Sequence, residues 1–282
     1  MGAIKRNIPN FITCLNLVCG FMGISAICHH QGEMAIFFVL LALIFDFLDG
    51  FVARLLKVTS AIGKDLDSLA DIVTFGVLPG IMMFEMLDFS WQIKQLSSPL
   101  IPAYVIDNNL HSPILSVSLF AILIPVFSAI RLAKFNHDIG QSFNFKGLPT
   151  PAVGILITSL YSYFLTYKLP ALNKTVHHMN VLEYIGIDFL TTIRDSILHF
   201  TFNNSWVLIM IAILFSFLLV SNVPLLAMKF KKFGWPANQW KYILLILSLP
   251  LIIFLGFASA PIILILYIIV SQIHFRTTNH EI

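Results

Sequence analysis

Eight long stretches of apolar residues constrain the fold of this chain more than any other feature. A helix needs about 20 predominantly apolar residues to cross the hydrocarbon core of a membrane, which is about 30 Å thick. Stretches of this kind lie at residues 11–28, 34–53, 66–87, 113–135, 150–168, 205–228, 240–256 and 259–275. The last two are short, and the sequence from Gly256 to Pro261 between them indicates a tight helical hairpin. We therefore predict an all-α polytopic membrane bundle of about eight transmembrane helices.

Composition supports this prediction and argues against two other classes of protein. Hydrophobic residues make up 58% of the chain and charged residues only 11%, whereas a soluble domain carries about 25% charged residues. A soluble fold of this length has no means of burying so much apolar surface. The net charge is only +3, and no basic run is interleaved with aromatic residues, so we expect no nucleic-acid partner. A single membrane domain over residues 1–282 is the simplest organisation.

The distribution of lysine and arginine predicts the orientation of the bundle. If the N-terminus is cytoplasmic and the eight segments alternate, thirteen of the 17 basic residues lie on the cytoplasmic side. Loops rich in lysine and arginine are retained on that side of the membrane. The basic residues on the other side are then Lys94, Lys168, Lys174 and Arg194. We therefore expect both termini to be cytoplasmic.

Four aspartates inside these segments point to a metal site. Asp46 and Asp49 lie near the cytoplasmic end of the second segment, and Asp67 and Asp71 lie at the start of the third. Spacings of three and four residues place each pair on one face of a helix. A carboxylate at the centre of a membrane helix costs about 2.5–3.5 kcal/mol, and four neighbouring ones repel each other. Their hard anionic oxygens suit Mg²⁺ or a similar cation such as Mn²⁺, and two such ions would balance four negative charges.

The residues around these aspartates fit a nucleotide diphosphate. Gly50, Ala53 and Gly63 are small where two helices would converge, and they leave a slot for a flat base. The planar guanidinium group of Arg54 can hold phosphate. Ser60 lies in the connecting loop and can hydrogen-bond to the same ligand. The set predicts a site on the cytoplasmic side of the membrane.

Two further groups of polar residues have alternative interpretations. Asn10 and Thr13 stand at the start of the first segment, where they either line the nucleotide site or cap the helix. Arg131 and Lys134 stand at the cytoplasmic end of the fourth segment, close to Asn136. These three residues are candidates for binding the carboxylate of a small acceptor such as serine. The alternative is that the two basic residues anchor the helix at the lipid headgroups.

The aspartates and their neighbours form the pattern Asp46-x2-Asp49-Gly50-x2-Ala53-Arg54-x8-Gly63-x3-Asp67-x3-Asp71. This pattern resembles the signature of the CDP-alcohol phosphatidyltransferases at all eight positions. Further segments resemble the phosphatidylserine synthase branch of that family. They lie at 8–20, 66–76, 131–136, 146–152 and 221–224. The resemblance runs from residue 8 to about residue 235 and leaves a C-terminal hairpin at about 240–275 unmatched.

This resemblance implies a fold, a reaction and roles for individual residues. The implied fold is a six-helix catalytic core in a homodimer, here extended by the C-terminal hairpin. The four aspartates would hold two divalent cations, Asp71 would be the general base, and Gly50, Arg54 and Ser60 would contact the CDP group. The implied reaction transfers a phosphatidyl group from CDP-diacylglycerol to L-serine. Two alternatives stay open: the same chemistry with glycerol phosphate or inositol phosphate as acceptor, and a cation-coupled membrane transporter.

Overall fold

The computed structural model describes residues 2–58, 60–96, 117–137, 145–172, 196, 200–226 and 234–279. Over this part of the chain the secondary structure is almost entirely helical. The α-helices are α1 (Gly2–Cys28), α2 (Gly32–Leu56), α3 (Ala61–Asp71), α4 (Leu78–Leu96), α5 (Leu123–His137), α6 (Thr150–Leu172), α9 (Ser205–Val220), α10 (Trp235–Leu255) and α11 (Ala260–Asn279). A π-helical segment, Ile72–Val77, joins α3 to α4 without a break, and 3-10 turns at Val117–Ile122 and Gly256–Ser259 precede α5 and α11.

The structure confirms the prediction of an all-α membrane bundle. Each of the eight apolar segments contains helix, and the last two form the expected hairpin through the 3-10 turn at Gly256–Ser259. Among the described residues, five helical spans are long and apolar enough to cross a membrane. They are Asn7–Cys28, Gly32–Leu56, Ile62–Lys94, Val117–His137 and Ala260–Thr277. Shorter apolar helices at Ser205–Val220 and Asn238–Ile253 accompany them, so the chain is a multi-pass membrane protein.

One expectation at the N-terminus needs correction. Helix α1 begins at Gly2, so Asn10 and Thr13 lie within the helix and do not cap its first turn. Pro9 also lies inside α1, one residue before Asn10.

Two of the basic residues expected on the outer side, Lys174 and Arg194, are outside the described residues.

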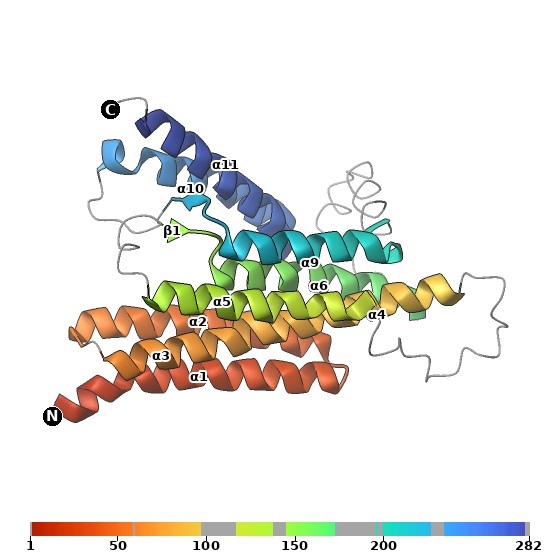
Figure 1. Ribbon diagram of the computed structural model, residues 1–282, viewed down its shortest axis with the longest axis horizontal. Coiled ribbons are helices and arrows are strands. Elements are labelled where there is room, and N and C mark those ends of the chain that lie inside the picture. Colours follow the sequence, from red (N-terminus) through yellow and green to blue (C-terminus); the bar gives the residue numbers. More distant parts are fainter. Residues whose placement is uncertain are drawn as a thin grey trace.

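Figure 1 shows helices α1 to α6 and α9 running alongside one another, while the α10–α11 hairpin lies obliquely across them. The start of α1, the start of α3 and the end of α11 are at the same end of the molecule, on the left of this view. A two-stranded antiparallel ribbon lies at this end, formed by β1 (Phe145–Lys146) and β2 (Pro224–Leu225). It connects the segment before α6 to the segment after α9.

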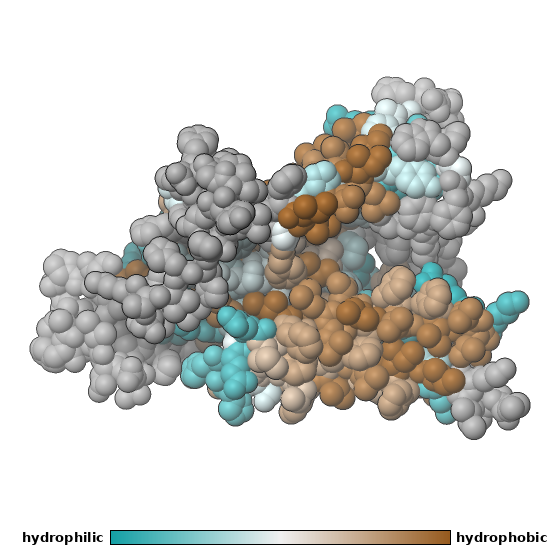
Figure 2. All heavy atoms as spheres, turned by 180° about the vertical axis from the view of Figure 1, so that it is seen from behind, coloured by the Kyte–Doolittle hydropathy of each residue, from teal (hydrophilic) through white to brown (hydrophobic). Residues whose placement is uncertain are grey.

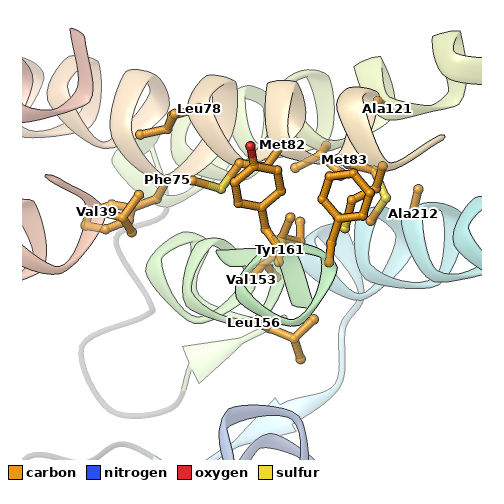
Figure 3. Packing of buried hydrophobic residues seen from close by; sticks show 14 of the residues in the cluster. Val39, Phe75, Leu78, Met82, Met83, Ala121, Val153, Leu156, Tyr161 and Ala212 are labelled. Atoms are coloured by element: carbon orange, nitrogen blue, oxygen red, sulfur yellow. The ribbon is translucent and has the colours of Figure 1, made fainter. Parts of the chain in front are cut away.

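The core surrounds the continuous helix that contains the π-helical segment. Phe75 and Leu78 are fully buried, as are Met82 and Met83 one turn further along, and Figure 3 shows Met82 beside Tyr161 of α6. Helix α1 reaches the π-helical segment because Gly20 lacks a side chain. A Cβ atom there would lie 2.5 Å from Thr74 Oγ1 and 3.1 Å from Thr74 Cα. Small residues permit this close approach of helix backbones in membrane proteins.

The outer face of α1 and α2 is strongly apolar. Phe11 and Phe21 of α1 are 65% and 66% exposed, and Phe47 and Leu55 of α2 are 64% and 68% exposed. Figure 2, seen from behind, shows a broad hydrophobic band along the lower part of the molecule with hydrophilic residues at its ends. In a soluble protein such a surface would cause aggregation, whereas lipid tails solvate it in a membrane.

Candidate active site

The turn between α2 and α3 places the site at one end of the bundle. Lys57 has a left-handed backbone (φ 53°) and ends α2, with its amide donating to the carbonyl oxygen of Arg54 at 3.2 Å. Ser60 caps the start of α3 because its Oγ accepts a hydrogen bond of 2.9 Å from the amide of Gly63. This cap satisfies one of the unpaired amides of the first helical turn. The short turn joins α2 to α3, and α1 packs against both helices.

Three aspartates from both helices meet beside this turn. Asp46, Asp49 and Asp67 each offer one carboxylate oxygen, and these three atoms lie within 4.8 Å of one another. Asp71 lies one helical turn after Asp67, near enough to interact electrostatically with all three of these aspartates. Asp49 and Asp71 are buried, while Asp46 and Asp67 are half-buried. The structure therefore brings all four predicted aspartates together, and a cluster of hard anionic oxygens matches the ligands of a divalent cation such as Mg²⁺.

Helix α1 orients two of these carboxylates. Thr13 Oγ1 donates a hydrogen bond of 2.7 Å to Asp49 Oδ2, and Asn16 Nδ2 donates one of 3.3 Å to Asp71 Oδ1. Thr74 Oγ1 in turn donates to the backbone carbonyl of Asn16 at 3.2 Å. Hydrogen bonds of this kind fix the orientation of carboxylates that bind metal. The prediction from sequence included Thr13 but missed Asn16. Asn16 lies three residues after Thr13, on the same face of α1, and this spacing could have identified it.

A cleft of about 410 Å³ opens next to the aspartates. Most of the residues predicted to contact a nucleotide line it, together with two of the aspartates. The lining residues are Pro9, Asn10, Thr13, Asp49, Gly50, Ala53, Val58, Ser60, Gly63, Lys64 and Asp67. Pro9, Val58 and Lys64 were not predicted from the sequence. Arg54 is exposed at its edge, and its Nε donates to the carbonyl oxygen of Gly50 at 2.9 Å.

The two glycines of the cleft lack a side chain for different structural reasons. A Cβ atom on Gly63 would lie 2.8 Å from both Asn10 Oδ1 and Ser60 Oγ, so this glycine permits tight packing of α1 against the start of α3. A Cβ atom on Gly50 would meet nothing within 4 Å. Gly50 therefore faces open space in the cleft, and packing does not account for its small size.

The three candidate acceptor residues occupy different environments. Arg131 is 8% exposed, donates from Nη1 to Thr150 Oγ1 at 3.2 Å, and interacts electrostatically with Asp71. Asn136 is half-buried and donates from Nδ2 to Ser68 Oγ on α3 at 2.9 Å. Lys134 is exposed on the surface of α5. None of the three lines the cleft, but Arg131 places a buried positive charge near Asp71.

Comparison with known proteins identifies relatives of this chain. Residues 6–185 match the family model described as CDP-alcohol phosphatidyltransferase. The CDP-diacylglycerol–serine O-phosphatidyltransferase of Bacillus subtilis is 30% identical over 153 residues, which cover 54% of this chain and 74% of the relative. The Helicobacter pylori protein of the same name is 30% identical over 188 residues, 66% of this chain and 70% of the relative. An archaetidylserine synthase of Methanothermobacter thermautotrophicus is 32% identical over 157 residues, 55% and 57% of the two chains.

Proposed function

This chain belongs to the CDP-alcohol phosphatidyltransferase family, and on that basis we propose that it transfers the phosphatidyl group of CDP-diacylglycerol to the hydroxyl group of L-serine. The products are phosphatidylserine and CMP. The observation that carries this proposal is the group of Asp46, Asp49 and Asp67, with Asp71 one helical turn further along, beside a cleft of about 410 Å³. The names of the relatives from Bacillus subtilis and Helicobacter pylori support serine as the acceptor.

The proposed ligands of two divalent cations, Mg²⁺ or Mn²⁺, are Asp46, Asp49, Asp67 and Asp71. The residues fit such ions because their oxygens converge, and because Thr13 and Asn16 restrict the rotation of two of the carboxylates. Ions bound there would supply positive charge against the diphosphate and the departing CMP. Without the ions, the counter-charge described near the four carboxylates is the Arg131 guanidinium beside Asp71.

The proposed nucleotide site is the cleft itself, with contacts from Asn10, Thr13, Gly50, Ala53, Arg54, Ser60 and Gly63. The open space at Gly50 leaves room for the flat cytosine ring. Ser60 and Asn10 are both placed to hydrogen-bond to a ligand there. Lys64 adds a positive charge to the lining, and its Nζ already donates to the carbonyl oxygen of Asn136 at 2.8 Å.

In the proposed reaction Asp71 is the general base. The serine hydroxyl is a poor nucleophile at neutral pH, so its proton must be taken as the new bond forms. The serine oxygen bonds to the phosphorus that carries diacylglycerol, the bond from that phosphorus to CMP breaks, and the proton moves to Asp71. Asn16 holds this carboxyl group by its hydrogen bond to Oδ1.

The proposed acceptor site contains Arg131, with Asn136 nearby and Lys134 at the surface. A single buried guanidinium suits the carboxylate of serine, whereas glycerol phosphate or inositol phosphate would call for a denser cluster of positive charge. We further propose that residues 1–282 form one domain, with a catalytic core at about 8–235, and that the protein is a homodimer with its site facing the cytoplasm. Family membership argues against the alternative of a cation-coupled transporter.

The test is release of CMP from CDP-diacylglycerol by the purified protein in detergent. We expect release with L-serine in Mg²⁺ or Mn²⁺, none with a chelator, and little with glycerol 3-phosphate or inositol phosphate. Asp67→Asn should abolish release, and Asp65→Asn is the matched control because Asp65 is exposed on the same helix. Release with another acceptor would replace serine in the proposal. No release with any acceptor, from folded protein, would overturn the function.

A further inference from the structure

Helix α11 lies beyond the part of the chain that matches the family, yet its side chains make three hydrogen bonds to β2 and to Leu226, which directly follows β2. The Tyr267 hydroxyl donates to the carbonyl oxygen of Leu226 at 2.9 Å, and Ser271 Oγ accepts from the amide of Leu226 at 3.1 Å. Gln272 Nε2 donates to the carbonyl oxygen of Pro224 at 3.0 Å. Tyr267 and Ser271 are one helical turn apart and together bind both backbone polar groups of Leu226, and Gln272 follows Ser271 directly.

The strand β2 in turn fixes the segment that leads into α6. It pairs with β1 in antiparallel register, with Lys146 opposite Pro224. The amide of Gly147 donates to the carbonyl oxygen of Val223 at 3.0 Å. Gly147 has a φ of +75°, and a Cβ atom there would lie 2.6 Å from the carbonyl oxygen of Leu219. The backbone here is therefore held closely, three residues before α6 begins at Thr150.

Thr150 connects this ribbon to the candidate acceptor site. Its side chain is fully buried and its Oγ1 accepts the hydrogen bond from Arg131 Nη1. The Nε of Arg131 is buried and has no hydrogen-bond partner among the described residues, so Thr150 is important for the orientation of the guanidinium group. Arg131 lies near both Asp71 and Tyr267. The chain of contacts from α11 thus ends at the one buried guanidinium close to the aspartates in the described structure.

We propose that α11 is a positioning element for the acceptor site: Tyr267 and Gln272 hold β2, which sets Thr150 and thereby the direction of the Arg131 guanidinium toward Asp71. This inference rests on the proposed function and extends it by assigning a role to the C-terminal hairpin. Tyr267 acts through Arg131 and does not touch the reacting atoms. Because Arg131 holds the carboxylate before and during transfer, its displacement raises KM for the acceptor and leaves kcat unchanged.

The test uses Tyr267→Phe and Gln272→Leu in the full-length protein. The first removes the hydrogen bond to Leu226, directly after β2, and the second removes the one to Pro224 in β2. Each should raise KM for serine about 2- to 10-fold. KM for CDP-diacylglycerol and kcat should stay at the wild-type values, and the loss of one hydrogen bond should lower the thermal unfolding midpoint by only a few degrees. Tyr167→Phe is the chemically matched control, because its hydroxyl donates to Asn203 far along α6 from Thr150. Thr277→Val is the control on α11 itself, because the Thr277 hydroxyl bonds only to its own helix in the described structure.

A double-mutant cycle separates positioning from general stability. If Tyr267 acts through Arg131, then Tyr267→Phe should have no further effect on KM for serine in an Arg131→Met background. Equal effects of Tyr267→Phe in both backgrounds would overturn the inference. An unchanged KM for serine in Tyr267→Phe and Gln272→Leu would also overturn it, whether or not the unfolding midpoint falls.

The outcome for the wild type distinguishes the two proposals. Absence of CMP release with every acceptor would overturn both of them. Release with serine, combined with wild-type kinetics in Tyr267→Phe and Gln272→Leu, would overturn only the role of α11. If another acceptor proves to be the substrate, the same rise in KM for that acceptor would uphold the role of α11 without serine.

Discussion

Asp71 differs from the other three aspartates in its surroundings. It is 7% exposed, it accepts a hydrogen bond from Asn16, and the π-helical segment begins at the next residue. π-Helical turns are rare and occur frequently at functional sites. The oxygens of Asp46, Asp49 and Asp67 form one tight group, and Asp71, which we propose as both a ligand and the base, stands outside this group. Burial and a fixed orientation favour Asp71 as the group that takes the proton of the acceptor.

Replacement of Asp71 by asparagine tests this role. Asp71→Asn keeps the size of the side chain and removes its ability to accept a proton. We expect kcat to fall by about 10²- to 10⁴-fold, the usual contribution of a general base, while the affinity for CDP-diacylglycerol stays largely intact. Measurements of CMP release and of equilibrium binding of the lipid substrate check both parts. Wild-type turnover by this variant would remove Asp71 from the base role.

At the level of residues, the sequence predicted the grouping of the aspartates because helical spacing alone puts Asp46 with Asp49 and Asp67 with Asp71 on common faces. The partners on α1 were harder to predict. Asn16 meets Asp71 only because α1 packs closely against the π-helical segment, and such a contact between distant segments leaves no periodic signal. The same reason explains why Lys64, two helical turns before Asp71, was not predicted as a lining residue of the cleft.

At the level of elements, glycines serve two different purposes in these helices. Gly20 lets α1 touch the backbone at Thr74, whereas Gly50 leaves open space beside the aspartates. The sequence predicted one continuous span at 66–87, and the chain is indeed helical throughout. It did not predict the change to π-helix at Ile72–Val77, because that change depends on the packing of Thr74 and Gly76 against α1 and α5.

The two glycines provide a matched pair of alanine substitutions. Gly20→Ala should lower the free energy of unfolding by about 1–3 kcal/mol, because the new methyl group overlaps Thr74 and forces α1 outward. Gly50→Ala should raise it by about 0.5–1 kcal/mol, since alanine favours a helix interior and meets no neighbour here. The same Gly50→Ala change should raise KM for CDP-diacylglycerol by intruding into the cleft. Thermal unfolding in detergent and initial-rate kinetics separate the two effects, and a stability loss in Gly50→Ala would contradict this assignment.

At the level of the whole molecule, the end of α2, the start of α3 and the end of α5 share one end of the bundle with the start of α1 and the end of α11 (Figure 1). These parts of the helices carry the aspartates, most of the cleft lining and the acceptor residues. This placement suits a reaction between a membrane lipid and a water-soluble acceptor. Hydropathy predicted the helical segments because each segment contacts lipid and therefore has to be apolar by itself. The β1–β2 ribbon was not predicted, since two strands of two residues exist only through pairing across nearly 80 residues of chain.

Cysteine labelling in intact cells tests which side of the membrane this end faces. In a variant whose three native cysteines are alanines, Gln31→Cys places a thiol in the turn between α1 and α2, and Lys57→Cys places one beside the cleft; both positions are exposed. Because most basic residues gather at the end that holds Lys57, the positive-inside rule assigns that end to the cytoplasm. A membrane-impermeant maleimide should therefore label Gln31→Cys in intact cells and Lys57→Cys only after permeabilisation. The reverse pattern would put the aspartates on the outer face, where cytoplasmic serine has no access to them.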